Sequence, residues 1–278
     1  MRIESPFLSV EIEPSDASVV NIYDKERREH YFSGGGLKHF FPIVGNVKDD
    51  RFRLGRKFYP MTSEGIIGLL TFTKASSAND SVVFEASSNE ETLKVYPFEF
   101  KLSFEYKVYG PNLNITWKVE NTAKKEILFS VGSKMTFDLP GEGEKLRDYY
   151  WSFEKNETYG AYYLQEGLIN FEYKDDRSVY VKNNIPLHDD IFRSGPLVFR
   201  EMDSEKISLI NKQSSQEIEF FYGNSKYLAI GNRSKLNLLI AHGITDYIFS
   251  DHDFYKKEGI VQLDPLGTFK ESFEIRFK

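Results

Sequence analysis

Cysteine is absent from this 278-residue chain, which excludes disulfides, thiolate catalysis and cysteine-ligated zinc. Long apolar runs are absent as well: no window approaches the roughly 18 apolar residues of a membrane-spanning helix, and residues 1–10 contain no signal-peptide core. The net charge is -6, and the chain has no basic patch of the kind that binds nucleic acid. We therefore expect a cytoplasmic protein with neither a membrane nor a nucleic acid as its partner.

Aromatic residues, by contrast, are abundant: the chain has 24 phenylalanines and 17 tyrosines. Aromatic side chains fit the pleated, half-buried surface of a strand. They also stack on the apolar faces of sugars, although most aromatic side chains of a protein lie in its core. The composition therefore suits a β fold and is compatible with a carbohydrate site.

Strict alternation of apolar and polar residues is the dominant pattern. It extends over residues 98–108, stops at the turn sequence Gly-Pro-Asn of residues 110–112, and resumes over residues 113–119. This pattern predicts a long antiparallel hairpin with one buried face. At the C-terminus, Phe269, Phe273, Ile275 and Phe277 share one strand face, which Glu271 interrupts.

Shorter strands separated by turn residues are predicted along the rest of the chain. They are expected at residues 7–12, 19–23, 69–75, 81–87, 127–133, 149–153, 206–211, 217–222 and 227–232. Short helices are expected at residues 189–192 and 251–257, and no segment has a sustained helical period. Because no linker or repeat divides the chain, we expect residues 1–278 to form a single all-β domain.

The motifs that could hold a cofactor or a metal are weak. Residues 33–36 (Ser-Gly-Gly-Gly) lack the lysine and hydroxyl residue of a phosphate-binding loop. His188-Asp189-Asp190 and Asp251-His252-Asp253 are short clusters without a third spaced ligand. No serine lies in a Gly-x-Ser-x-Gly elbow. We therefore expect no cofactor and no metal, and hydrolase chemistry has no support.

Several segments together resemble one known family. Residues 41–49 (Phe-Pro-Ile-Val-Gly-Asn-Val-Lys-Asp) resemble the Phe-Pro-Ile-Val-Gly-Arg stretch of short bacterial aldose 1-epimerase relatives, and residues 130–140 resemble their Gly-Gly-His-Pro-Ala-Phe-Asn segment. Further similar segments, in family order, are residues 53–59, 89–98, 187–199 and 257–269. The ordered set covers nearly the whole chain, so the chain resembles the galactose mutarotase-like, or aldose 1-epimerase, family.

The resemblance implies a fold and an activity. The fold is a super-sandwich of large antiparallel sheets with an open cleft for a monosaccharide. The family's relatives interconvert the α and β anomers of aldoses. A carboxylate removes the proton of the anomeric hydroxyl while a histidine protonates the ring oxygen, and such a pair needs pKa values near the working pH.

The family's functional residues are replaced at the matching positions. Its sugar-binding arginine falls on Asn46, its two histidines on Glu64 and Lys134, an aspartate on Gly195, and its general-base glutamate on Leu239. Leucine cannot accept a proton, and lysine normally titrates near pH 10, which makes it a poor acid here. The resemblance therefore implies that no catalytic residue is retained.

The same positions predict a sugar-binding site. Glu64 and Lys134 carry opposite charges where the family has two histidines, so we expect an ion pair across the cleft floor. Asn46 is expected to approach the same cleft, where its amide could bind a sugar hydroxyl. His242 is expected near the opposite wall.

Three functions are compatible with this sequence. The first is a carbohydrate-binding protein that lacks standard mutarotase activity. The second is a divergent isomerase that uses Glu64, Lys134 or His242 on an unusual sugar, such as an anionic one attracted by Lys134. The third is an interaction protein with a vestigial cleft. A cleft rich in aromatic and amide groups would favour the first, and a cleft filled by side chains would favour the third.

Overall fold

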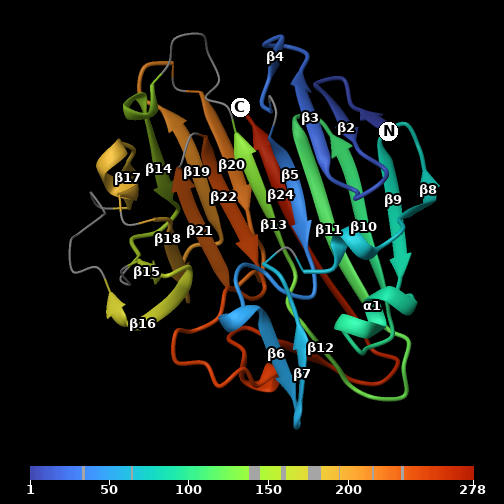
Figure 1. Cartoon of the computed structure of the whole chain (residues 1–278). Helices are drawn as coiled ribbons and strands as arrows, with labels where there is room; N and C mark the ends of the chain where they lie inside the picture. Colours follow the sequence, from blue (N-terminus) through green and yellow to red (C-terminus); the bar gives the residue numbers. More distant parts are fainter. Residues whose placement is uncertain are drawn as a thin grey trace.

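Two large antiparallel β-sheets make up most of the protein (Figure 1). The computed structural model describes residues 1–32, 35–63, 65–137, 145–157, 161–174, 183–193, 195–214, 216–232 and 235–278. Within these ranges, one sheet has eleven strands and the other has nine. The all-β prediction is confirmed.

The larger sheet combines the N-terminal strands with strands from the second half of the chain. Its path is β1-β2-β3-β5-β13-β22-β21-β18-β15-β16, and β4 pairs with β3. The strands are β1 (Arg2–Glu4), β2 (Leu8–Ile12), β3 (Val19–Asp24), β4 (Glu29–His30), β5 (Gly36–Phe40), β13 (Gly132–Phe137), β15 (Tyr162–Gln165), β16 (Leu168–Lys174), β18 (Leu197–Arg200), β21 (Tyr227–Asn232) and β22 (Leu236–Ala241).

The second sheet follows the order β17-β14-β19-β20-β24-β11-β10-β9-β8. Its strands are β8 (Thr73–Ser77), β9 (Ser81–Ser87), β10 (Phe100–Tyr109), β11 (Asn112–Asn121), β14 (Tyr149–Phe153), β17 (Asn184–Pro186), β19 (Lys206–Asn211), β20 (Glu217–Phe221) and β24 (Thr268–Phe277).

Short elements complete the described part of the chain. Two small two-stranded sheets pair β6 (Arg51–Leu54) with β7 (Lys57–Pro60), and β12 (Ile127–Phe129) with β23 (Val261–Leu263). One α-helix is described, α1 (Glu90–Val95), together with 3₁₀ turns at Lys48–Asp50, Ile67–Leu69, Leu146–Asp148, Asp189–Phe192 and Phe254–Lys256. Among the described residues, no helix has the length and apolarity needed to cross a membrane.

The predicted hairpin forms the centre of the nine-stranded sheet. In the β10–β11 pair, Phe104 lies directly opposite Trp117, and both side chains are fully buried. Their alternation with polar residues places one face of the hairpin against the larger sheet. The hairpin prediction is confirmed, with strand ends that differ by one or two residues.

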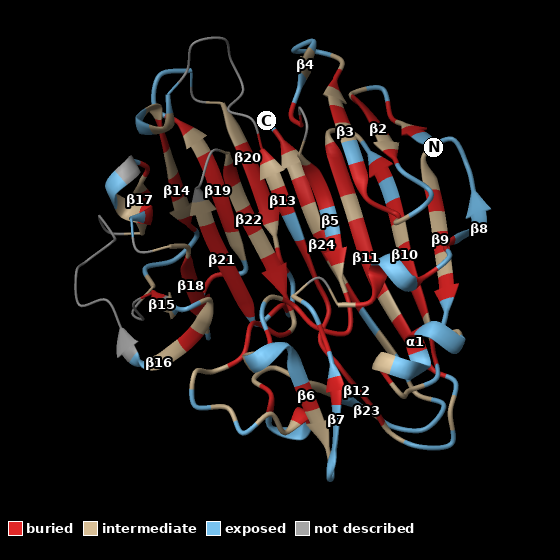
Figure 2. Cartoon of the chain, viewed as in Figure 1, coloured by how far each residue is buried: buried red, intermediate tan, exposed pale blue. Residues whose placement is uncertain are grey.

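The core lies between the two sheets, where Figure 2 shows buried residues along the central strands of both. The ring of His39 on β5 stacks on Phe104 on β10, with the ring centroids 3.9 Å apart. Phe137 on β13 meets Phe220 on β20 edge to face at 5.4 Å. These contacts hold the sheets face to face, as in a β-sandwich.

Two predicted strands differ from the structure. The segment 127–133 was expected to be one strand, but β12 ends at Phe129 and β13 begins at Gly132, because the Ser130 amide bonds to the Pro42 carbonyl between them at 2.7 Å. In the segment 69–75, only the part from Thr73 onward is a strand. Alternation does not reveal where a chain leaves one sheet for another.

Helix α1 was not predicted, since six residues are too few for a helical period to emerge. Its start is fixed by a capping box: the Asn89 side chain accepts the Thr92 amide at 2.9 Å, and the Thr92 hydroxyl accepts the Asn89 amide at 2.8 Å. These bonds satisfy amide groups that have no partner within the helix.

The structure also explains the polar interruption in β24. Glu271 is buried on the inward face, where its carboxylate bonds to the ring of His242 at 2.7 Å and accepts the hydroxyl of Ser225 at 2.5 Å. A buried carboxylate needs such partners. The apolar face therefore tolerates one acidic residue because two distant segments bring it hydrogen-bond donors.

Candidate functional site

The outward face of the eleven-stranded sheet carries the candidate site. Along β13, Ser133 and Met135 are buried against the second sheet, whereas Lys134 is exposed on the outward face together with half-buried Thr136. Side chains of a strand alternate between its two faces. The same alternation places Leu239 of β22 outward, directly opposite Lys134.

A cavity of about 610 Å³ lies on this outward face, and we call it the Asn46 cavity. Its lining is mostly apolar, with two amide side chains, one hydroxyl and two cations. The lining residues are Gly45, Asn46, Lys134, Leu164, Gly167, Phe192, Arg193, Gly195, Pro196, Val198, Ala229, Gly231, Asn237, Leu239, Ile244 and Thr245. An apolar lining with a few polar groups is typical of small-molecule sites.

A second cavity, of about 630 Å³, continues along the same sheet face, and we call it the Lys38 cavity. It shares Gly45, Lys134 and Leu239 with the Asn46 cavity. The two cavities therefore form one cleft, with Lys134 and Leu239 where they meet. Lys38 and Ser63 line the second cavity only.

Loop contacts build the wall of the Asn46 cavity. The hydroxyl of Thr245 donates to the carbonyls of Asn46 and Gly167 at 2.8 and 3.0 Å, and the Asn46 amide donates to the Gly167 carbonyl at 3.1 Å. Gly167 has a φ of +80°, and a Cβ there would lie 2.2 Å from the Asn46 amide nitrogen. The positive φ favours glycine here, and a larger residue would also displace the Asn46 side chain.

A buried ion pair supports the wall from behind. The ammonium of Lys257 lies 2.8 Å from the Asp246 carboxylate and donates to the Ile244 carbonyl at 2.7 Å. Both side chains are almost fully buried, at 2% and 5% exposed. Burial lowers the pKa of Lys257, and the charge of Asp246 opposes that shift. The pair fixes the segment that presents Ile244 and Thr245 to the cavity.

The structure brings four of the predicted positions together. Asn46, Lys134, Gly195 and Leu239 all line the Asn46 cavity, although they are far apart in the sequence. Glu64 lies outside the described residues, and so does its predicted ion pair with Lys134; its neighbour Ser63 lines the Lys38 cavity.

His242 is placed differently from the expectation. It is not among the described residues that line either cavity, and its ring bonds to Glu271 between the sheets. In β22, Leu238 and Ile240 point inward. His242 is two residues further along the chain and therefore lies on the same inward side. The pleat thus directs this side chain away from the cleft.

Acid–base groups are scarce among the described lining residues. Asp16 is the carboxylate at the edge of the Lys38 cavity, and its oxygen accepts the backbone amide of Ser18 at 3.0 Å. His39 borders the same cavity, but it is buried, and burial lowers its pKa to about 3. Within this described part of the cleft, no carboxylate faces a histidine across the floor.

A third cavity, of about 580 Å³, is lined by charged residues that already pair with one another. Arg200 donates to the Glu258 carboxylate at 3.2 Å, and the Tyr227 hydroxyl donates to it at 2.6 Å. Burial, followed by the hydrogen bond and charge of Glu258, raises the pKa of Tyr227. Arg200, Tyr227 and Glu258 are thus engaged with one another in this cavity.

The side chains of the Asp251-His252-Asp253 cluster are engaged in other contacts. Asp251 and Asp253 lie 3.7 and 3.3 Å from the guanidinium of Arg53, and His252 bonds to Asp49 at 2.8 Å. Over the described ranges, no group of three or more side chains is arranged to hold a metal ion.

Several lining residues were not identified from the sequence, among them Lys38, Asn237 and Thr245. Lys38 lies on β5, which was not predicted as a strand, and Asn237 lies on β22, which was also not predicted. Residues 36–40 do alternate, with Leu37 and His39 buried and Lys38 exposed. That short alternation was the available signal.

Comparisons with known proteins agree on one family. The model of the aldose 1-epimerase family matches residues 46–218, which is more than half of the chain. This range includes Asn46, Lys134 and Gly195 but not Leu239. A search of curated protein sequences gave no match.

Solved structures reproduce the whole fold. A galactose mutarotase related enzyme from Lactobacillus acidophilus superimposes with a TM-score of 0.91 at 22% identity, covering 100% of this chain and 97% of that one. A galactose mutarotase-like protein from Lactobacillus casei gives 0.90 at 21% identity, covering 100% and 99%. A putative aldose 1-epimerase from Escherichia coli K12 gives 0.78 at 12%, covering 100% and 98%. Because the family model matches more than half of the chain and the sheets have the galactose mutarotase-like fold, the chain belongs to the aldose 1-epimerase family.

Proposed function

We propose that this protein binds a monosaccharide in the cleft and lacks standard mutarotase activity. The observation that carries the proposal is the convergence of Asn46, Lys134, Gly195 and Leu239 on one open cavity. The family resemblance assigns these positions to sugar binding and catalysis. They occupy one cavity here, but their side chains cannot perform the family's acid–base chemistry.

The size and lining of the cavity support sugar binding. Its volume of about 610 Å³ lies within the range of small-molecule sites. Asn46, Asn237 and Thr245 lie along an aliphatic floor, and each keeps hydrogen-bonding capacity beyond its contacts within the protein. This open lining argues against a vestigial cleft, although Phe192 is the one aromatic residue among the described lining residues.

The replaced residues support the absence of mutarotation. Leu239 offers no proton-accepting group, and Lys134 stands where the family's acid is expected. Loss of one positioned acid or base typically costs about 10² to 10⁴ in rate. We therefore expect no acceleration when freshly dissolved α-D-glucose or α-D-galactose is followed by polarimetry with the protein present.

Binding is tested separately by calorimetric titration with a panel of monosaccharides. The variant Ala229→Leu places a larger side chain on the cavity floor and should weaken sugar binding by about tenfold or more, a change of about 1.4 kcal/mol. The matched control is Ser76→Leu on exposed β8, which should leave binding unchanged. Rapid mutarotation would refute the proposal and favour the divergent isomerase. Absence of binding to every sugar would favour a vestigial cleft.

A further inference from the structure

Two lysines lie side by side on the floor of the cleft. Lys38 on β5 and Lys134 on β13 are directly opposite each other in the antiparallel ladder. Residues paired in this way point to the same face, with Cβ atoms about 4.5 to 5.5 Å apart. Both side chains are exposed, and both line the Lys38 cavity. Two positive charges therefore share one small area of the cleft.

Neither lysine has a counter-ion in the described part of the chain. No ion pair or hydrogen bond joins either ammonium group to a described residue, whereas Lys101 on β10 meets Glu85 of the adjacent strand at 2.8 Å. Asp16 lines the same cavity without contacting either ammonium group. Like charges directly opposite each other destabilise a sheet. An anion that binds between Lys38 and Lys134 would remove this repulsion.

The position of the pair relates it to the sugar site. Lys134 lies at the junction of the two cavities, so its ammonium group can reach a ligand whose ring occupies the Asn46 cavity. The Asn46 cavity also presents the side chains of Asn46 and Thr245. One end of the cleft is therefore suited to an anionic group and the other to sugar hydroxyls.

We propose that the ligand of this cleft is an anionic monosaccharide, whose phosphate or carboxylate group is held by Lys38 and Lys134. This inference rests on the proposed sugar-binding function and specifies its substrate class. Lysine binds phosphate and carboxylate as a flexible point charge. A phosphate group carries about -1.5 to -2 charges at neutral pH and can engage both ammonium groups at once.

The charge of the site predicts a dependence on salt. Exposed charges are screened over about 10 Å at 0.1 M ionic strength and about 3 Å at 1 M. Affinity for an anionic sugar should therefore fall as sodium chloride is added, while affinity for a neutral sugar should change little. Both affinities can be measured on the same protein sample.

The test is calorimetric titration of the full chain with four ligands: glucose, glucose 6-phosphate, glucuronate and inorganic phosphate. We expect at least one anionic sugar to bind about tenfold or more tightly than glucose, which corresponds to about 1.4 kcal/mol. Lys38→Met and Lys134→Met should each remove most of this preference, and Lys38→Arg should retain it. Lys74→Met on exposed β8 is the matched control and should have no effect.

The outcomes separate this inference from the proposed function. If glucose and the anionic sugars bind equally and the lysine variants change nothing, the inference is overturned while sugar binding stands. If inorganic phosphate binds as tightly as glucose 6-phosphate, the site holds an anion only and the inference is also overturned. If no sugar binds, both proposals fail. Thermal melting of each variant confirms that it is folded. The ratio of the affinities for glucose 6-phosphate and glucuronate identifies whether the site takes a phosphate or a carboxylate group.

Discussion

His39 lies between the two sheets, where it is part of a chain of hydrogen bonds that extends from Trp117 to Ala17. The indole of Trp117 donates to the hydroxyl of Ser133 at 2.9 Å, and this hydroxyl donates to Nδ1 of His39 at 2.7 Å. Nε2 then donates to the hydroxyl of Tyr106 at 2.6 Å, which in turn donates to the carbonyl of Ala17. A neutral imidazole satisfies this network, with Nδ1 as acceptor and Nε2 as donor, and burial favours the neutral form.

This arrangement predicts loss of stability in acid. Burial lowers the pKa of His39 from 6.5 to about 3 in the folded protein. Between these values the unfolded chain binds more protons, so the stabilisation is complete above pH 6.5 and is lost as the pH falls towards 3. Between pH 7.5 and pH 4.5 the contribution of His39 to the free energy of unfolding should fall by up to about 3 kcal/mol.

Urea unfolding of the wild type and of His39→Gln at both pH values measures this contribution. The variant should be less stable at pH 7.5, but its stability should decrease less on acidification. His30→Gln is the control, because His30 is exposed and its ring bonds to Asn21 on the neighbouring strand. Equal pH dependence of wild type and His39→Gln would contradict the assignment.

The buried pair of Lys257 and Asp246 predicts a non-additive effect on stability. Asp246→Asn leaves the Lys257 ammonium buried without a counter-charge, which typically costs about 3 to 5 kcal/mol. Adding Lys257→Met to this variant should recover part of the loss, because no isolated charge is left. The free energy of unfolding in urea is the measurement.

The neighbouring pair of Lys256 and Asp251 is the matched control, since both of its side chains are largely exposed, at 69% and 50%. Asp251→Asn should therefore have little effect. A double variant that is as unstable as the sum of the two single variants would show that Lys257 and Asp246 are not energetically coupled.

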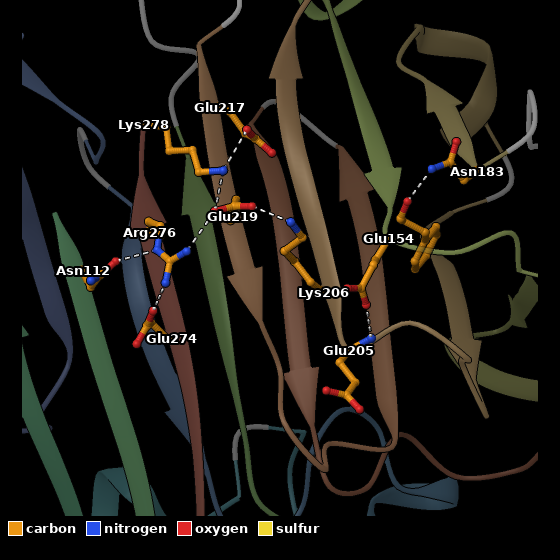
Figure 3. A network of polar contacts seen from close by, with 11 residues as sticks. Asn112, Glu154, Asn183, Glu205, Lys206, Glu217, Glu219, Glu274, Arg276 and Lys278 are labelled. Carbon is orange, nitrogen blue, oxygen red and sulfur yellow. Dashed lines mark hydrogen bonds and ion pairs between the residues drawn. The ribbon is translucent and has the colours of Figure 1, made fainter.

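At the scale of the elements, β20 and β24 are joined by a polar network on the outward face of the nine-stranded sheet. Figure 3 shows three cations, Lys206, Arg276 and Lys278, directed towards Glu219 from adjacent strands and the C-terminus. Their nitrogens lie 2.5, 3.5 and 2.9 Å from the carboxylate, whose side chain is only 2% exposed. Burial alone would raise the pKa of Glu219, but hydrogen bonds and charges from Lys206 and Lys278 lower it.

Removal of this charge should therefore destabilise the sheet. Glu219→Gln leaves three cations near one another without their shared negative charge, and we expect a loss of about 1 to 3 kcal/mol, typical of a charged hydrogen bond. The loss should decrease at high salt, because the half-exposed cations are then screened. Thermal melting at low and high salt provides the measurement. Glu105→Gln, in a more exposed pair with Lys270, should change the melting temperature little. A shift as large as that of Glu219→Gln would contradict a special role for this network.

The register of β13 is the element-level feature on which the site depends. Lys134 reaches the cleft because Ser133 and Met135 point into the core on either side of it. A shift of one residue would bury the lysine and expose Met135. The pairing of β13 with β5 and β22 thus determines which side chains the cleft contains.

At the scale of the whole molecule, the absence of a linker predicts that residues 1–278 unfold as one domain. Trp117 on β11 and Trp151 on β14 are both fully buried, and three strands lie between β11 and β14 in the nine-stranded sheet. Trp117→Phe and Trp151→Phe therefore leave one fluorescent reporter on each side of the sheet. In each variant, the urea transition followed by fluorescence should coincide with that followed by circular dichroism. Separate midpoints in either variant would indicate two independently unfolding domains.

Local sequence pattern was sufficient for the strands whose alternation is long and regular. The hairpin of β10 and β11 could be predicted because apolar residues such as Phe104 and Trp117 recur at every second position, and this signal needs no knowledge of distant residues. Resemblance to the aldose 1-epimerase family, spread over the chain, then indicated the sheet architecture and the positions Asn46, Lys134 and Leu239.

The composition of the cleft was decided by pairing between distant segments. Lys38 and Lys134 are 96 positions apart and become neighbours only through the ladder of β5 and β13. His242 lies against Glu271 rather than in the cleft, because strand parity and sheet packing determine which way it points. A strand's local pattern specifies two faces, but not which strand pairs with it or which face is covered. Those choices depend on burial summed over both sheets, and only the folded molecule contains that information.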